Sequence, residues 1–187
     1  MKFCSLILEK YNNEDESSLG STHILGCPDV PKSWNDDAVF FNDEVFLGQI
    51  NLADVDIDAL PKKGILYFFF ASESRPYRGI VRYTENIDDL ERVDFNSEVE
   101  FDANLNQEYA VKFSNQSGEI QLLGPLPQFK HYNCKTREVL LFKFNPQAYH
   151  EIDIFKNIDE EICYLIDEED LKKFNFDKAH LSLSLDD

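Results

Sequence analysis

The chain contains two similar runs of residues, 25–70 and 123–166. Each run has, in the same order, a turn with Gly and Pro, an apolar segment that ends in Asn, an acidic stretch and a second apolar segment. The matched pairs, with their separations in residues, are Gly26 and Gly124 (98), Asn51 and Asn145 (94), and Tyr67 and Tyr164 (97). These nearly constant separations predict an internal duplication, with similar halves at about 20–85 and 118–180 of one domain that covers 1–187.

The apolar segments of both halves are typical of β-strands. They are short and rich in aromatic and β-branched residues, and 79–84 alternates between two faces. Only one Met is present, and Met favours helices. The expected strands are 5–10, 38–41, 45–50, 65–71, 79–84, 99–101, 109–113, 139–144 and 162–166. We therefore predict a β-dominated α+β domain with antiparallel pairing, few short helices and one core shared by the two halves.

The connections carry their own signals. Asp167 predicts an N-cap for a short helix at 168–174, whose first turn holds three acids that suit the positive end of the helix dipole. The other expected connections are a rigid turn at 26–31, a loop or single helical turn at 52–60, a short helix or irregular link at 87–93, and the junction between halves within 85–108.

The net charge of −18 limits the choice of partner. Nucleic-acid binding needs Lys and Arg to replace condensed counterions, so a nucleic-acid partner is not expected. An anionic membrane surface is disfavoured for the same reason. The charge is compatible with solubility alone and with fast association with a basic partner.

No segment predicts export or a membrane span. The apolar run after Lys2 ends at Glu9, and no small-residue cleavage site follows it. A cytoplasmic location is therefore expected. The cysteines have no metal-binding spacing, and in a reducing compartment they are predicted to be free thiols: Cys4, Cys27, Cys134 and Cys163.

A search for chemistry in the sequence finds no catalytic set. The run 54–58 resembles a calcium loop, but Ala59 stands where the loop needs Gly, and Ile65 stands where it needs Glu. His131 lies three residues before Cys134 without an oxyanion loop, so a surface thiol is the favoured interpretation of this cysteine. No catalytic residue, cofactor or metal is predicted.

Two repeated residue types leave alternatives open. Asn51 and Asn145, with Tyr67 and Tyr164, could face a cleft shared by the halves. The favoured interpretation is structural, because Asn at a strand end caps turns and Tyr at a buried edge keeps its hydroxyl in water.

Five motifs of the sequence are similar to those of a known family. They are Gly-x-Pro-x-x-Pro at 26–31, Phe-Leu-x-Gln-Ile-Asn at 46–51, Leu-Pro-x-x-Gly-x-Leu-x-Phe-Phe at 60–69, Gln-Leu-Leu-Gly at 121–124 and Glu-Asp-Leu-Lys at 169–172. By these residues the chain resembles the YwqG-like family of bacterial domains, over roughly 20–180. It departs from the family at Leu25, where a Gly is frequent, and at 157–161, which lacks a Gly-Asp-x-Gly segment. The resemblance implies no established activity. It does imply frequent proximity to toxin genes, and some members look like immunity proteins.

Two functional hypotheses follow from the charge and the resemblance. The first is a non-enzymatic, acidic immunity or antitoxin-like protein that binds and neutralises a basic toxin domain. Its partner-binding residues are expected in the densest acidic loops: Asp54, Asp56, Asp58, Asp88, Asp89, Glu91, Asp159, Glu160 and Glu161. The alternative is an enzyme or small-ligand-binding domain that uses a cleft between the two halves.

Overall fold

The structure is a computed structural model that describes residues 2–10, 17–36, 44–71, 78–93, 107–127, 137–151, 156 and 158–184. The strands are β1 (Cys4–Lys10), β2 (His23–Ile24), β3 (Asp29–Pro31), β4 (Glu44–Asn51), β5 (Ile65–Ala71), β6 (Arg78–Thr84), β7 (Leu90–Arg92), β8 (Tyr109–Ser114), β9 (Ile120–Leu122), β10 (Glu138–Phe144), β11 (Glu161–Asp167) and β12 (His180–Ser184). The helices are α1 (Lys32–Asp36), α2 (Glu168–Lys172) and the 3₁₀ turns η1 (Leu52–Asp54), η3 (Pro146–Tyr149) and η5 (Phe176–Lys178). Strands therefore dominate, and the helices are few and short, as predicted.

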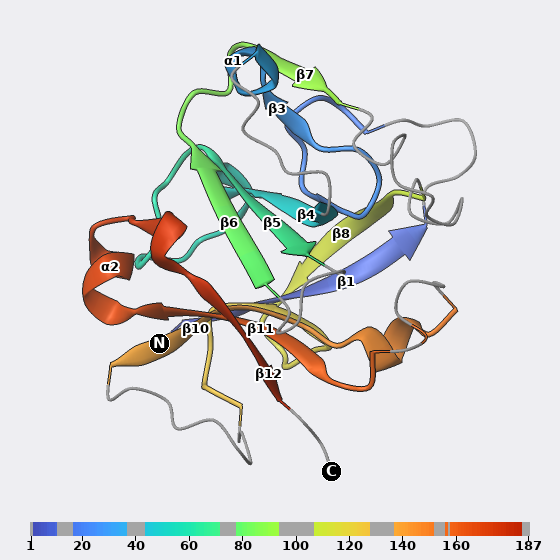
Figure 1. Cartoon of the computed structure of the whole chain (residues 1–187), viewed down its shortest axis with the longest axis vertical. Coiled ribbons are helices and arrows are strands. Elements are labelled where there is room, and N and C mark those ends of the chain that lie inside the picture. The colour runs from blue at the N-terminus through green and yellow to red at the C-terminus, as the bar shows by residue number, and fades with distance from the viewer. Residues whose placement is uncertain are drawn as a thin grey trace.

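One large sheet holds most of the strands (Figure 1). Its strand order is β12-β11-β10-β9-β1-β8-β2-β4-β5-β6, and neighbouring strands pair antiparallel. The order is symmetric about the central pair β1–β8: β9 and β2 flank this pair, then β10 and β4, β11 and β5, and β12 and β6. The matched runs of the sequence thus occupy matched places in the sheet.

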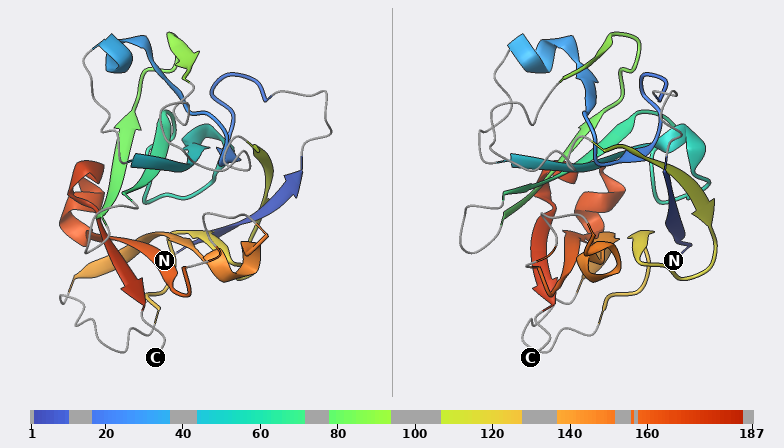
Figure 2. Two further views of the ribbon diagram at one scale, coloured as in Figure 1. Left: turned by 45° about the vertical axis from the view of Figure 1, so that its right-hand side comes forward. Right: turned by 90° about the vertical axis from the view of Figure 1, so that its right-hand side faces the viewer.

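The sheet curls until its two ends face each other (Figure 2). Gly79 of β6 permits this approach, because a Cβ there would lie 2.6 Å from Cε1 of Tyr164 and 3.0 Å from Cβ of Leu181. The Tyr164 hydroxyl donates a hydrogen bond of 2.6 Å to the carbonyl oxygen of Phe69. The edge strands β6 and β12 therefore nearly close the sheet.

Aromatic rings join the two ends of the sheet in one core. Phe68 of β5 stacks on Phe142 of β10 with ring centroids 4.1 Å apart, and Tyr164 of β11 meets Phe68 edge-on at 5.4 Å. All three side chains are buried. These aromatic side chains thus occupy the space between β5 and the facing strands β10 and β11.

Among the described residues, a second layer covers the outer face of the first half and not of the second. Strands β3 and β7 form a two-stranded sheet, and α1 follows β3; the three elements lie together at the top of Figure 1. Trp34 of α1 packs edge-on against Tyr67 of β5 at 5.2 Å. This layer encloses a smaller cluster around Val30, Phe46 and Phe69.

The same backbone features recur in both halves. Leu25 and Leu123 both have φ of 57°, and their N–H groups donate 2.9 Å hydrogen bonds to the carbonyls of Leu47 and Leu141. The middle strands bulge at matching places, between Phe46 and Gly48 in β4 and between Leu140 and Phe142 in β10.

The two asparagines act as caps. The Asn51 side chain accepts a hydrogen bond from the N–H of Ala53 at the start of η1, and Asn145 accepts one from the N–H of Gln147 in η3. The capping interpretation of these residues is therefore confirmed. Asp167 also caps its helix, by accepting from the N–H of Glu169.

The pairing of the two tyrosines is wrong by one residue. Phe68 lies opposite Gly48, and Tyr164 lies opposite Phe142, so Tyr164 corresponds to Phe68 rather than to Tyr67. Tyr67 and Tyr164 consequently belong to different clusters and share no cleft. Neither hydroxyl is in water, because each donates to a backbone carbonyl.

Other expectations need smaller corrections. The stretch 26–31 is not only a turn, because β3 occupies its end, and 87–93 contains β7 instead of a helix. The helix after Asp167 ends at Lys172, before the predicted 174. Cys4, Cys27 and Cys163 are free thiols. The segments 38–41 and 99–101, with His131 and Cys134, lie outside the described residues.

Candidate functional site

A buried carboxylate organises the junction between the large sheet and its covering layer. Asp29, at the start of β3, has no solvent exposure. Its Oδ2 accepts hydrogen bonds from the N–H of Gly20 at 2.9 Å and from Nε2 of Gln49 at 3.0 Å. Nε of Arg92 donates to Oδ1 at 2.8 Å, and Nη2 donates to Oδ2 at 3.2 Å. These bonds offset the cost of burying the charge.

Strand register explains why these groups meet. Asp29 pairs with Arg92 across the β3–β7 ladder, and Gln49 pairs with Tyr67 across the β4–β5 ladder. The Tyr67 hydroxyl donates a 2.6 Å bond to the carbonyl of Asp29. Burial raises the pKa of Tyr67 well above its usual range, with the charge of Asp29 adding to the effect. The hydroxyl therefore remains a donor that holds β3 on the sheet.

His23 of β2 adds a hydrogen-bond acceptor at this site. Its Nδ1 lies 2.8 Å from the carbonyl oxygen of Leu25, which can only accept, so Nδ1 carries the hydrogen. Burial lowers the pKa of the imidazole, although Glu108 and Asp29 oppose this shift. The neutral ring thus has a lone pair on Nε2, which is buried, lies 4.0 Å from Oδ2 of Asp29 and has no hydrogen-bond partner.

Glu108, just before β8, carries the second such acceptor. Its Oε1 is buried and has no hydrogen-bond partner, and its Oε2 lies 3.9 Å from Nη1 of Arg92. Because β2 pairs with β8, His23 and Glu108 lie at the seam between the two halves. Each of these two acceptors lacks a hydrogen-bond donor among the described residues. Among the described residues, no group of three or more His, Cys, Asp or Glu side chains could hold a metal ion.

The acidic residues chosen from the sequence all lie outside the core. Most have partners within the chain. These pairs are Asp54 with Thr22, Asp56 with Lys2 and Lys62, Asp58 with Lys62, Asp89 with Lys32, Glu91 with Asn35, and Glu161 with Lys143. Glu160 also interacts with another residue of the chain. The carboxylates of Asp88 and Asp159 make no hydrogen bond or ion pair with a described residue.

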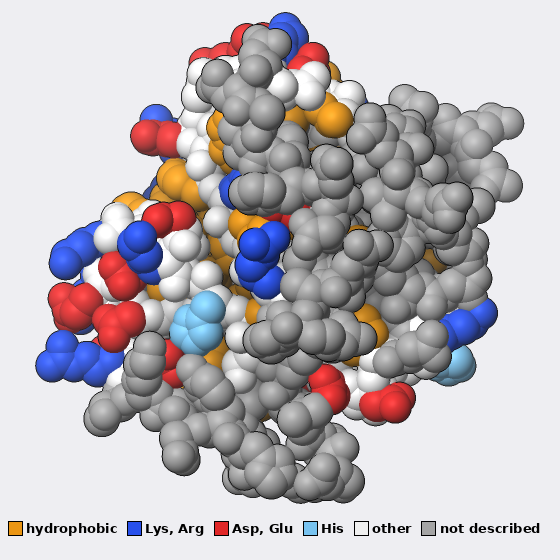
Figure 3. Space-filling model, in the orientation of Figure 1, with side chains coloured by type: hydrophobic (Ala, Val, Ile, Leu, Met, Phe, Trp, Pro, Cys, Tyr) orange, Lys and Arg blue, Asp and Glu red, His pale blue; other side chains and the backbone are white. Residues whose placement is uncertain are grey.

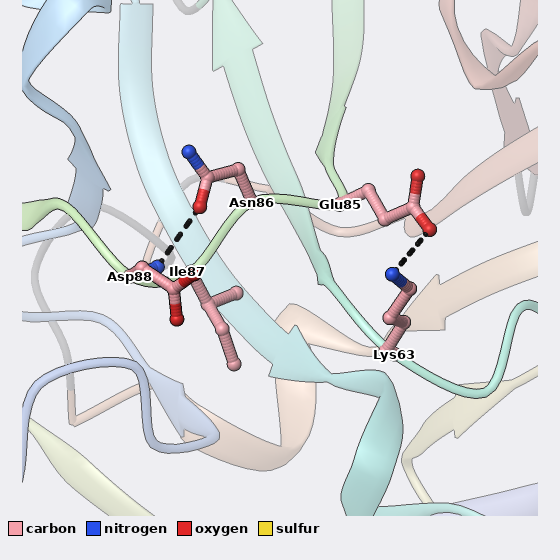
Figure 4. Close-up of a pocket in the computed structure, with 5 residues that line it drawn as sticks. All are labelled: Lys63, Glu85, Asn86, Ile87 and Asp88. Atoms are coloured by element: carbon pink, nitrogen blue, oxygen red, sulfur yellow. Dashed lines mark hydrogen bonds and ion pairs between the residues drawn. The ribbon is translucent and has the colours of Figure 1, made fainter.

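The structure brings these residues together only within their own segments. Asp56 and Asp58 share Lys62. Asp88 lines a hollow of about 440 Å³ (Figure 4), which is also lined by Lys63, Glu85, Asn86 and Ile87. Within it, Lys63 pairs with Glu85 at 2.7 Å, and the side chain of Asn86 accepts from the N–H of Asp88.

A second hollow, of about 340 Å³, lies beside the edge strand β6. It is lined by Trp34, Val81, Arg82, Tyr83, Phe174, Phe176 and Asp177. Figure 3 shows hydrophobic side chains exposed on the left of the molecule, between groups of mixed charge. Sequence reasoning missed this hollow, because its walls come from three distant segments.

Sequence reasoning also missed the Asp29 network. Its side chains lie up to 85 positions apart, from His23 to Glu108. Asp29, Gln49 and Tyr67 lay within three separate motifs of the sequence, and nothing in those motifs indicated a contact among them. The one available signal was a set of polar residues inside or next to apolar strands. Such residues need partners when buried, but the sequence does not identify those partners.

The comparisons with known proteins place this architecture in a family. No curated protein matches the chain. No helix among the described residues is long and apolar enough to cross a membrane. Residues 22–138 match the family described as a domain of unknown function (DUF1963). This range begins just before β2, ends at the first residue of β10, and includes β6 and every side chain described above for the Asp29 network. Because the match covers more than half of the chain, the protein belongs to the DUF1963 family.

Proposed function

We propose that this protein is a non-enzymatic, acidic immunity or antitoxin-like protein of the cytoplasm, which binds and neutralises a basic toxin domain. One observation carries the proposal: the acidic loops lie outside the core of a chain with net charge −18, and the carboxylates of Asp88 and Asp159 have no partner among the described residues. Unpaired surface carboxylates are available to Lys and Arg side chains of a partner.

Opposite charges would speed the association of the two proteins and orient them relative to each other. An excess of one sign attracts an oppositely charged protein over a Debye length of about 10 Å at 0.1 M salt. Lys62, Lys32 and Lys143 reduce this attraction locally, because each already pairs with an acidic residue. The groups near Asp88 and Asp159 are therefore expected to contribute most to steering.

The test is co-expression with the product of the neighbouring gene. Rescue of growth from that product's toxicity, together with a stable complex of the two purified proteins, is the expected result. The association rate should fall about tenfold or more between about 20 mM and 500 mM salt, because salt screens the charges. Lack of rescue by any flanking gene product, or a rate unchanged by salt, would contradict the proposal.

A second candidate function has one specific observation in its favour. His23 Nε2 and Glu108 Oε1 are buried acceptors without donors at the seam between the halves. Donors from a small molecule or from ordered water would offset the cost of burying them unpaired. Native mass spectrometry of the purified protein separates these possibilities. A mass increment that disappears in His23→Asn supports a ligand, and the bare mass argues against one.

The internal duplication is also a proposal, supported by the symmetric strand order and the matched left-handed leucines, bulges and asparagine caps. On this proposal each unit contains five strands of the large sheet, β1 to β6 without β3 in the first and β8 to β12 in the second. Fragments 1–93 and 107–187, when co-expressed, should then assemble into one folded complex. Fragments that remain separate or unfolded would contradict the proposal.

A further inference from the structure

We propose that the basic partner docks along β6, with an apolar side chain in the hollow lined by Phe174 and a Lys or Arg at Asp88. This inference rests on the proposed function and adds the place and the chemistry of the contact. The docking surface consists of the hollow beside β6 and the hollow formed just after this strand ends, and we call it the β6 surface. The occupant is an extended, basic segment of the partner.

The first hollow suits an uncharged side chain. Its aromatic walls are Trp34, Tyr83, Phe174 and Phe176. Its charges are already paired: Arg82 donates two hydrogen bonds to Glu44, at 2.8 and 3.0 Å, and Asp177 lies 3.2 Å from Lys178. An apolar or aromatic side chain would therefore gain more here than a charged one, which would have to be desolvated.

Phe174 is held at the rim by a strained backbone. It follows α2 with φ of 58°, a left-handed conformation that is a clear outlier for a bulky residue. The N–H of Asn175 bonds to the carbonyl of Asp170, and the N–H of Phe174 to that of Leu171, which is the helix ending where Gly is usual. Phe174 nevertheless occupies this position, and its ring is 44% exposed.

The second hollow supplies the negative charge. The Asp88 carboxylate lines this hollow and pairs with no described residue, and the neighbouring Ile87 is 40% exposed. A hydrogen bond links the walls of the two hollows: the Tyr83 hydroxyl, in the wall of the first, donates to the carbonyl of Lys63, in the wall of the second, at 3.1 Å. An apolar side chain followed by a basic one would thus meet matching surfaces in order along β6.

A short synthetic peptide tests the inference directly. It contains one Phe among several Lys residues, and its binding is followed by changes in the amide resonances of the labelled, full-length protein. We expect saturable shifts at 81–88 and 174–177 at low salt. A peptide with Ala for Phe should bind about tenfold more weakly, and one with Glu for Lys should not bind.

Variants separate this surface from general attraction to a basic peptide. Phe174→Gly and Phe174→Asn keep a residue that tolerates the left-handed backbone, so both should fold, and both should weaken binding about tenfold. Asp88→Asn should weaken it about threefold. Asp159→Asn removes a similar charge outside the two hollows and should weaken it clearly less, because it lowers only the long-range attraction. Leu19→Ser is the control for removing an exposed apolar side chain.

The outcomes distinguish the two proposals. Two results would overturn docking at the β6 surface: shifts confined to 54–58 or 159–161, or undiminished binding by both Phe174 variants. Either result would still be compatible with the proposed function of an acidic binding protein. An equal loss in Asp88→Asn and Asp159→Asn would also overturn docking at the β6 surface. Absence of any binding to the basic peptide at low salt would contradict both this inference and the proposed function.

Discussion

Two matched sets of three neighbouring strands can be compared: β2, β4 and β5, which we call the first bend, and β9, β10 and β11, which we call the second bend. Their backbones have the same features, but their side chains differ. Both have a left-handed Leu, a bulge in the middle strand and an Asn cap. On the outer face, the first bend carries Gln49 and Tyr67, which serve the Asp29 network. The second has instead a small apolar cluster of Leu140, Cys163 and Leu165.

This difference separates the features that build the fold, which both bends share, from the side chains that can serve a function, which differ. The shared features close a curled sheet around one core and need no particular chemistry. In the described part of the chain, the covering layer of β3, α1 and β7 lies over the first bend and has no counterpart over the second. Trp34 of that layer also lines the β6 surface. We therefore expect substitutions in the first bend to have larger and more specific effects than those at matching places in the second.

The largest expected contrast is between two ion pairs. Asp29→Ala removes the fully buried partner of Arg92 and several other hydrogen bonds, so unfolding should become easier by about 3–5 kcal/mol. Glu161→Ala removes the partner of Lys143 in the second half, which is more exposed, and should cost about 1 kcal/mol. Urea denaturation measures both. Equal losses would break the comparison.

The pH dependence should also belong to the first half. Burial places the pKa of His23 below its ordinary value of 6.5. Between these two values the unfolded chain binds a proton that the folded chain does not, so stability is complete above about pH 7 and decreases as the pH falls. The slope from this group is at most about 1.4 kcal/mol per pH unit. The matching residue in the second half, Gln121, does not titrate.

His23→Asn tests this dependence by urea denaturation between pH 7 and 5. The Asn amide can still donate to the carbonyl of Leu25 but takes up no proton in this range, so the curve should flatten. A variant as steep as the parent protein would assign the pH dependence to other groups.

Strands and caps were accessible from the sequence because they depend on local signals. Alternation within 79–84 predicted β6, and Asp167 predicted the start of α2. The Asp29 network and the hollow beside β6 depend instead on contacts across many residues, such as Arg92 with Asp29. The one-residue misalignment of Tyr67 with Tyr164 has a similar cause, because only the strand register shows that the spacing of the second half is different.

The two asparagine caps offer a closer comparison of matched positions. Asn51→Ala and Asn145→Ala each remove a cap, which typically costs about 1 kcal/mol. Asn51 also donates a 2.8 Å bond to the partly buried carbonyl of Gly20, whereas Asn145 donates to the exposed Glu119. We expect the Asn51 variant to lose about twice as much stability. Thermal unfolding measures the difference, and a larger loss at Asn145 would contradict it.

The smallest expected change in stability is at Phe174. Substitution by Gly relieves the left-handed backbone by about 1 kcal/mol but removes the stacking of Phe174 on Phe176. The melting temperature should stay within a few degrees of the parent value. A drop of more than about 2 kcal/mol in the free energy of unfolding would instead make the Phe174 ring part of the structural core.

Hydrogen exchange of the complex with the partner identified by co-expression tests most directly where this protein binds. Amide exchange is compared, with and without the partner, between the β6 surface at 81–88 and 174–177 and the second bend at 139–144 and 161–167. The β6 surface should become protected while the second bend stays unchanged. Protection of the second bend, with the β6 surface exchanging as in the free protein, would contradict the account.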